Sequence, residues 1–253
     1  METGAITNHI DVAQLVLYAF WLFFAGLIVY LHKEDKREGY PLETTGPNPM
    51  KFNGFPDLPA PKTFTLPHGG GSVTVPRDED PQYELDADPI APYAGAPLHP
   101  RGDGIGKGVG PGAYALRSET PDLTFDGKPR IVPLRVATAH RLDERDPNPI
   151  GLPVLGADGQ QAATVIDAWV DLAEPHVRYL EIDVAGVHTL LPTNFSRIGR
   201  DAVRVQSLLS TQFGGLPALK NPDQVTLAEE DIITAYYGSG TLYATAERSE
   251  PLI

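Results

Sequence analysis

Carboxylate side chains are the most plentiful groups in this sequence that could do chemistry. The chain has 33 Asp and Glu against 20 Lys and Arg, which gives a formal net charge of -13. A carboxylate that is removed from water, or that lies beside another negative charge, has a raised pKa and can exchange a proton near neutral pH. We expect most of these carboxylates to be solvated surface charges. The alternative hypothesis is that a few of them line a buried proton path. The candidates are Asp122, Asp126, Asp167, Asp171, Glu174, Glu181, Asp183, Glu229, Glu230 and Asp231.

Other kinds of site lack the residues or the spacing that they need. There is no cysteine, which excludes disulfides, thiolate metal sites, iron–sulfur clusters and a cysteine nucleophile. None of the seven histidines stands four residues from another, so the usual helical metal-binding pair is missing. The glycine-rich run from Gly102 to Gly112 resembles a phosphate loop, but Gly108 follows Lys107 where that motif requires Ser or Thr. We therefore expect no catalytic or metal site, and expect this run to be flexible or held by a partner.

One segment is apolar enough to cross a bilayer. Residues 12–31 read VAQLVLYAFWLFFAGLIVYL, in which Gln14 is the one strongly polar side chain. About 20 such residues match the hydrocarbon thickness of a membrane. A cleaved signal peptide would need a basic start, and a buried globular helix would keep a polar stripe. Lys33, Lys36 and Arg37 follow directly, so we expect a transmembrane helix over residues 12–32, with residues 1–11 outside and the rest cytoplasmic.

The remaining chain is divided by composition into two parts. Frequent Pro and Gly predict an extended, partner-binding segment over residues 33–110, with a hairpin formed by Lys62–Leu66 and Ser72–Val75. Residues 111–253 are expected to form a cytoplasmic domain that contains a small, bent sheet or barrel over about 148–240. Five β-branched runs predict its strands: Val154–Leu155, Ala162–Leu172, Val177–Val184, Thr189–Leu191 and Ala202–Val205. Thr226 and Glu229 form a capping-box pattern that predicts a short helix ending at Gly238.

Several blocks along the chain resemble, in the same order, the H subunit of the photosynthetic reaction centre of purple bacteria. They are FWLFFAGLIVYL (20–31), REGYPLE (37–43), PKTFTLPHG (61–69), NPIGLPV (148–154), WVD (169–171), RYLE (178–181) and VTLAEED (225–231). The blocks span nearly the whole chain and together are highly specific. The resemblance implies one transmembrane helix, a mainly β cytoplasmic domain built on a PRC-type barrel, irregular extended segments and a short C-terminal helix.

The same resemblance implies a role without catalysis by this chain. It implies a chain that binds no cofactor itself and caps the cytoplasmic face of the L and M subunits, which hold bacteriochlorophyll, bacteriopheophytin, quinones and non-haem iron. It also implies assistance in proton delivery to the secondary quinone. Expected partners are L, M, membrane lipid and the core light-harvesting antenna, with no nucleic acid. The expected location is the bacterial inner, intracytoplasmic membrane, with a periplasmic N-terminus.

The resemblance also assigns proton-pathway candidates. Asp171 and Glu174 match acidic positions of the family near the quinone, and Arg178 would offset their charge. Some relatives carry an acidic residue and two histidines at the proton entrance, where this chain has Thr124, Asp126 and Lys128. Because lysine is a poor proton acceptor at neutral pH, Asp122 and Asp126 are the proposed substitutes.

Two other functions stay open from the residues alone. A membrane-anchored binding module is compatible with a small barrel, because such folds serve unrelated functions. A membrane-tethered hydrolase would require a Ser-His-Asp arrangement, and no spaced motif in the sequence supports one.

Overall fold

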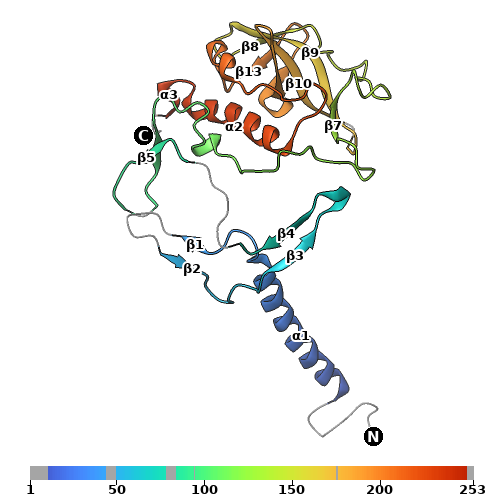
Figure 1. Cartoon of the computed structure of the whole chain (residues 1–253), viewed down its shortest axis with the longest axis vertical. Helices are drawn as coiled ribbons and strands as arrows, with labels where there is room; N and C mark the ends of the chain where they lie inside the picture. The colour runs from blue at the N-terminus through green and yellow to red at the C-terminus, as the bar shows by residue number, and fades with distance from the viewer. Residues whose placement is uncertain (1–10, 44–49, 78–83, 94, 175, 250–253) are drawn as a thin grey trace. The chain divides into compact units, whose positions relative to one another are not determined.

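The computed structural model describes residues 11–43, 50–77, 84–93, 95–174 and 176–249. The chain divides into two compact units, Met1–Asp80 with Pro92–Gly95, and Pro81–Ala91 with Ala96–Ile253. The predicted periplasmic residues 1–10 lie outside the described part. The first unit carries the long apolar helix, and the second carries the sheet (Figure 1).

Helix α1 spans Val12–Asp35 and is the predicted membrane helix. Asp11 caps its first turn by accepting a hydrogen bond from the Gln14 amide at 2.7 Å. None of its residues is buried within the unit. Its length and mean hydropathy of 2.2 suit a membrane span. The apolar N-terminal helix predicted from the sequence is therefore confirmed, and its regular structure continues beyond residue 32 to Asp35.

The segment after α1 is tied back to the end of that helix. The buried Lys36 ammonium donates to the carbonyls of Asn53 at 2.6 Å and Pro56 at 2.7 Å. Arg37 donates to the Ala60 carbonyl at 2.9 Å. Proline-rich chain leaves many backbone carbonyls without partners, so cationic side chains can hold it without a regular ladder. The predicted extended segment is thus ordered in part by its own chain.

Short antiparallel pairs complete the first unit. Strands β1 (Leu42–Glu43) and β2 (Lys51–Phe52) pair with each other. Strands β3 (Lys62–Thr65) and β4 (Ser72–Val75) form the predicted hairpin, with the 3-10 turn η1 (Pro67–Gly69) between them. The hairpin prediction is confirmed.

The second unit is built around a seven-stranded sheet. Its strand order is β11-β10-β9-β8-β13-β12, and β7 pairs with β9 beside that path. Breaks in register along β9 and β10 bend the sheet, as bulges do. All five predicted strand runs lie in this sheet. The strands are β7 (Ile131–Pro133), β8 (Pro153–Leu155), β9 (Gln161–Asp171), β10 (His176–Val184), β11 (Val187–Pro192), β12 (Ser196–Ile198) and β13 (Val203–Val205). A separate pair, β5 (Ala87–Pro89) and β6 (Leu98–Pro100), precedes it.

Helix α2 (Leu227–Tyr243) packs beside the sheet and shares its core (Figure 1). Trp169, Leu180, Phe213 and Tyr237 are among the largest fully buried side chains of that core. Shorter helical turns are η2 (Gly110–Gly112), η3 (Thr193–Phe195), η4 (Ser210–Gly215) and α3 (Ala246–Ser249). The Thr226–Glu229 capping box forms as predicted, with Thr226 accepting from the Glu229 amide.

The predicted end of α2 at Gly238 is wrong, because the helix continues to Tyr243. A Cβ at Gly238 would collide with the Pro111 carbonyl, and one at Gly240 with the Ser207 carbonyl. Glycine normally weakens a helix interior by about 1 kcal/mol relative to alanine. In α2 the two glycines let two backbone segments pack directly against the helix. The packing therefore outweighs the low helix propensity of glycine.

The glycine-rich run packs against this same helix. A Cβ at Gly112 would lie 2.7 Å from the Ser239 Cβ, and one at Gly110 would lie 2.8 Å from the Tyr243 hydroxyl. The Gly106 amide donates to the Ser239 hydroxyl at 3.3 Å. The run therefore serves close packing within its own chain, which the sequence alone did not indicate.

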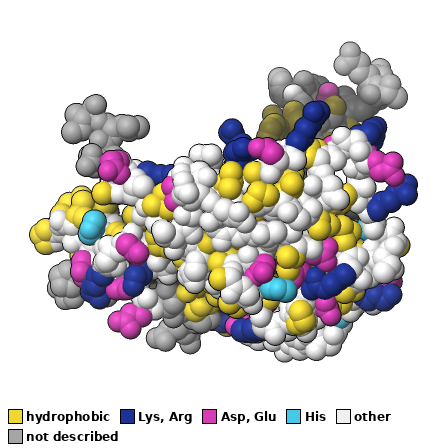
Figure 2. Space-filling view, turned by 90° about the horizontal axis from the view of Figure 1, so that it is seen from above, with side chains coloured by type: hydrophobic (Ala, Val, Ile, Leu, Met, Phe, Trp, Pro, Cys, Tyr) yellow, Lys and Arg dark blue, Asp and Glu magenta, His cyan; other side chains and the backbone are white. Residues whose placement is uncertain are grey.

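Charged side chains on the surface are mixed rather than segregated. Figure 2 shows acidic, basic and hydrophobic side chains interspersed across the face in view. Several surface cations pair with carboxylates, as in Arg101–Asp88, Lys107–Asp86 and Lys220–Glu119. Exposed pairs of this kind contribute little to stability, because water screens both charges.

Candidate functional site

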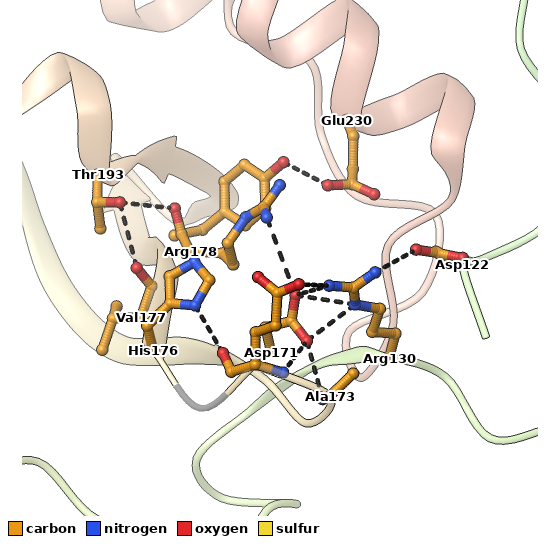
Figure 3. A network of polar contacts seen from close by, with 11 residues as sticks. Asp122, Arg130, Asp171, Ala173, His176, Val177, Arg178, Thr193 and Glu230 are labelled. Carbon is orange, nitrogen blue, oxygen red and sulfur yellow. Dashed lines mark hydrogen bonds and ion pairs between the residues drawn. The ribbon is translucent and has the colours of Figure 1, made fainter. Parts of the chain in front are cut away.

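A buried ion pair between Arg130 and Asp171 forms the centre of a polar network (Figure 3). The Arg130 Nε lies 2.9 Å from both Asp171 carboxylate oxygens, and its Nη2 lies 2.9 Å from Oδ2. The register of the sheet creates this contact, because Ile131 of β7 pairs with Asp171 at the end of β9. Arg130 therefore stands next to a carboxylate 41 residues away in the sequence.

Three further predicted residues join the same pair. Asp122 lies 3.4 Å and Glu174 lies 3.5 Å from Arg130 nitrogens, and Arg178 lies 3.8 Å from the Asp171 carboxylate. Asp122 is placed there by a bridge between Pro121 and Thr226. Asp171 and Glu174 flank the turn between β9 and β10. Four of the five sequence-predicted residues, Asp122, Asp171, Glu174 and Arg178, thus lie in one network.

Asp126, the fifth predicted residue, lies apart from Arg130. It is exposed in the turn between Asp122 and Arg130, beside Phe125, which is 96% exposed. The Thr124 amide donates to the Lys128 carbonyl at 2.8 Å and closes this turn. Asp126 is therefore a surface carboxylate that is exposed to solvent.

The network extends toward α2 through Glu230, one of the candidate carboxylates named from the sequence, and through Tyr179, which the sequence did not single out. The Tyr179 hydroxyl donates to the Glu230 carboxylate at 2.6 Å. Tyr179 is buried on β10, and Glu230 belongs to the first turn of α2. Figure 3 shows Glu230 in the same network as Arg178 and Asp171. The spacing of 51 residues explains why no local pattern revealed the contact.

The buried Asp171 and the half-buried Glu230 have pKa shifts of opposite direction. Burial alone would raise the pKa of Asp171, but hydrogen bonds from Arg130 and from the amides of Glu174 and Ala173 lower it below its ordinary 3.8. Within this chain the pKa of Asp171 is therefore lowered rather than raised toward neutral pH. Burial raises the pKa of Glu230 above 4.5, and the nearby Asp122 charge adds to the rise. Glu230 is thus the better proton acceptor.

The raised pKa of Glu230 predicts a pH-dependent stability. A group whose folded pKa exceeds its unfolded value stabilises the fold fully below the unfolded value, and this contribution is lost as the pH rises through the folded pKa. Glu230→Gln keeps an acceptor for Tyr179 and carries no charge. We expect the variant to lose less stability than the parent as the pH rises above 4.5.

Denaturant unfolding of the full chain in detergent over a pH series measures this difference. If the free energy of unfolding changes with pH in the same way for parent and variant, the assignment of a raised pKa to Glu230 is contradicted.

A second cluster of buried carboxylates lies farther along β9 and β10, away from the turn that joins them. Arg135 contacts Asp167 at 3.0 Å, Glu181 at 2.5 Å and Asp223 at 3.3 Å. The Trp169 indole donates to Glu181 at 2.8 Å. Asp167 and Glu181 are both buried, so Arg135 neutralises charge inside the fold. Arg135 therefore holds the two buried carboxylates, Asp167 and Glu181, in place.

No group of three or more His, Asp or Glu side chains suited to a metal ion occurs among the described residues. The network offers proton-binding oxygens and two guanidinium groups. Its chemistry is therefore proton holding and charge compensation.

Two family models match the chain. The model of the photosynthetic reaction centre H-chain N-terminal region matches residues 4–136, just over half of the 253. The chain belongs to this family. The model of the PRC-barrel domain matches residues 143–212, which include β8 to β13. The resemblance seen in the sequence blocks and the predicted PRC-type fold are both confirmed.

Membership in the H-chain family shows to which kind of complex the network belongs. H chains are structural subunits of the photosynthetic reaction centre, and they associate with L and M subunits in a complex whose cofactors lie in those other subunits. The apolar helix α1 fits the membrane anchor of such a subunit.

Proposed function

We propose that this chain caps the cytoplasmic face of the L and M subunits and assists proton delivery to the secondary quinone. In this arrangement α1 crosses the inner membrane with its N-terminus in the periplasm. Lys33, Lys36 and Arg37 support that orientation, because basic residues stay on the cytoplasmic side. The chain stabilises the complex and catalyses no reaction by itself.

The observation that carries the proton role is the joining of Asp122, Arg130, Asp171 and Glu230 in one partly buried network. In the proposed path, protons reach the exposed Asp126 from the cytoplasm and pass by way of Asp122 to Glu230. Asp171 stays ionised and, with Arg130 and Arg178, sets the local charge. Glu174, whose side chain is 71% exposed, is the acceptor that we place nearest the partner subunits.

Each group in this path has a distinct physical task. A proton acceptor works best when its pKa lies near the working pH, which burial and the Asp122 charge favour at Glu230. Arg130 and Arg178 lower the cost of gathering several carboxylates in one place. The Tyr179 hydroxyl fixes the orientation of the Glu230 carboxylate.

Purification of a tagged version of the chain from its native membrane tests the capping role. We expect a heterotrimer with two pigment-bearing membrane chains, visible as bacteriochlorophyll absorption in the purified sample. A pigment-free monomer in mild detergent would contradict the proposal and would favour a membrane-anchored binding module unrelated to photosynthesis.

A further inference from the structure

An exposed aromatic side chain stands close to the C-terminal end of α1. Phe55, in the chain between β2 and β3, is 83% exposed, which is more than any large apolar side chain of α1 itself. Phe52, at the end of β2, is 53% exposed. Large apolar side chains are unfavourable in water, so neighbouring ones on a surface indicate that another apolar phase covers them.

The loop that carries Phe55 is fixed to the end of α1. Lys36 directly follows the helix and is buried, and its ammonium donates to the carbonyls of Asn53 and Pro56. These two carbonyls lie on either side of Phe55 in the sequence. The same ammonium lies 5.2 Å from the centre of the Tyr40 ring, which is a cation–π distance. The exposure of Phe55 is therefore a property of a held loop.

Arg37 holds the other end of this loop. Its guanidinium forms two bonds of 2.8 Å with Glu34 in the last turn of α1, and it donates to the Ala60 carbonyl at 2.9 Å. It also donates to the carbonyl of Val75, the last residue of the hairpin, at 3.2 Å. The segment 53–60 is thus bound to the end of α1 at both of its ends.

The length of α1 gives the depth of this loop in a bilayer. The apolar span ends at Leu31, and Lys36 follows it in the sequence. At a rise of about 1.5 Å per residue, Lys36 lies about 7.5 Å beyond Leu31. The headgroup layer on each side of a bilayer is about 5–8 Å thick. Figure 1 shows the chain between β2 and β3 beside the end of α1. The carbonyls that Lys36 binds, and Phe55 between them, therefore lie at the level of the lipid headgroups.

We propose that Phe55, together with Phe52, is a membrane-surface anchor that inserts among the lipid headgroups of the leaflet in which α1 ends. An aromatic ring at this depth leaves water, as do the aromatic side chains that flank membrane spans. Lys33, in the last turn of α1, brings a positive charge to the same level, which suits lipid phosphates.

A second membrane contact has a mechanical consequence. A lone membrane helix can rotate about its own axis, whereas a helix with an anchored loop at its end cannot rotate without pulling the loop out of the lipid. The membrane-surface anchor therefore fixes the rotation of the first unit about α1. This inference rests on the membrane span of α1 in the proposed function and adds a contact outside that span.

Spin labelling of the full chain tests the contact. The chain has no cysteine, so each introduced cysteine carries the only label. The nitroxide is attached to Phe55→Cys, and the chain is reconstituted in vesicles of phosphatidylcholine and phosphatidylglycerol. Oxygen concentrates in lipid and a nickel chelate stays in water, so the ratio of their collision rates with the nitroxide measures its depth. Leu22→Cys, within α1, is the membrane reference, and Phe125→Cys, an exposed aromatic of the second unit, is the water reference.

We expect the ratio at position 55 to lie between those at positions 22 and 125, with several-fold fewer collisions with the nickel chelate than at position 125. Equal collision rates with the chelate at positions 55 and 125 would overturn the proposal. The measurement is repeated in the whole complex in its native lipids. A label at position 55 that neither reagent reaches there would show that a protein subunit covers Phe55, and this result would also overturn the proposal.

Lys36→Met tests whether the two hydrogen bonds hold the loop at this depth. Methionine keeps an unbranched side chain but cannot donate, so the label at position 55 should become more mobile and should meet the nickel chelate more often. Lys33→Met is the matched control, which removes a neighbouring charge from α1 and should leave the mobility of the label unchanged. An unchanged spectrum with Lys36→Met would contradict the holding role of Lys36.

The membrane-surface anchor and the proposed function fail in different ways. A label at position 22 that meets the nickel chelate freely would show that α1 does not cross the membrane, and would remove both. A label in lipid at position 22 with a label in water at position 55 would remove the anchor alone. A label at headgroup depth at position 55, in a chain that never joins a pigment complex, would remove the capping role alone.

Discussion

Arg135→Ala is expected to destabilise the chain by about 3 kcal/mol, the lower end of the cost of breaking a buried ion pair. The variant leaves the buried Asp167 and Glu181 carboxylates without their cation. It also removes the bonds from Arg135 to Asp223 and to the Pro222 carbonyl, which join the segment before α2 to the sheet. We expect a destabilisation at the lower end of that range because the Arg135 side chain is 40% exposed. Water can therefore partly take the place of the lost guanidinium group.

Denaturant unfolding of the full chain gives the change in the free energy of unfolding. Arg145→Ala is the matched control, since Arg145 is 88% exposed and pairs with Asp143 on the surface. That variant should leave the free energy of unfolding nearly unchanged. Equal effects of the two substitutions would show that the buried cluster has no special role.

Arg130→Met is expected to cost about 2–3 kcal/mol at neutral pH, because Asp171 stays buried after losing its bidentate partner. Amides of Ala173 and Glu174 still donate to Asp171, which limits the loss. In the parent chain the pKa of Asp171 is lowered, so its contribution is present above the unfolded pKa and is lost as the pH falls through the folded value. The difference between parent and variant should therefore shrink below about pH 4.

Unfolding at pH 7 and at pH 3.5 measures both parts of this prediction. Arg130→Lys keeps the charge but cannot form the paired contact, so its loss should be smaller than that of Arg130→Met. The double variant Arg130→Met, Asp171→Leu removes both charges and should recover stability. A deficit that stays the same at both pH values would mean that the charge of Asp171 is not the cause.

Most strands that lie in runs rich in β-branched residues could be predicted from the sequence, but β7 and β12 could not. The runs that became β9 and β10 have a clear pattern, because their side chains fill the core. Strand β7 has three residues and ends in Pro133, and β12 begins with Ser196 and Arg197, so neither resembles a typical strand. These two are defined by pairing with neighbours, which is a property of the folded chain.

The candidate site shows the same division. Asp171, Glu174 and Arg178 lie within eight residues, and family resemblance identified them. Arg130 contacts Asp171 across 41 residues of sequence. Glu230 contacts Tyr179 across 51 residues. Only the β7–β9 register and the packing of α2 bring them together. The direction of a pKa shift likewise depends on burial and partners, so the lowered pKa of Asp171 could not be read from the sequence.

The rate of proton uptake by the whole complex after the second of two light flashes tests the proton role most directly. The double variant Asp122→Asn, Glu230→Gln should slow uptake at the quinone by about 10–100-fold, since it removes the proposed acceptors. Asp201→Asn, which changes an exposed carboxylate between β12 and β13, should leave the rate unchanged. A double variant that takes up protons at the parent rate at both low and high pH would contradict the account.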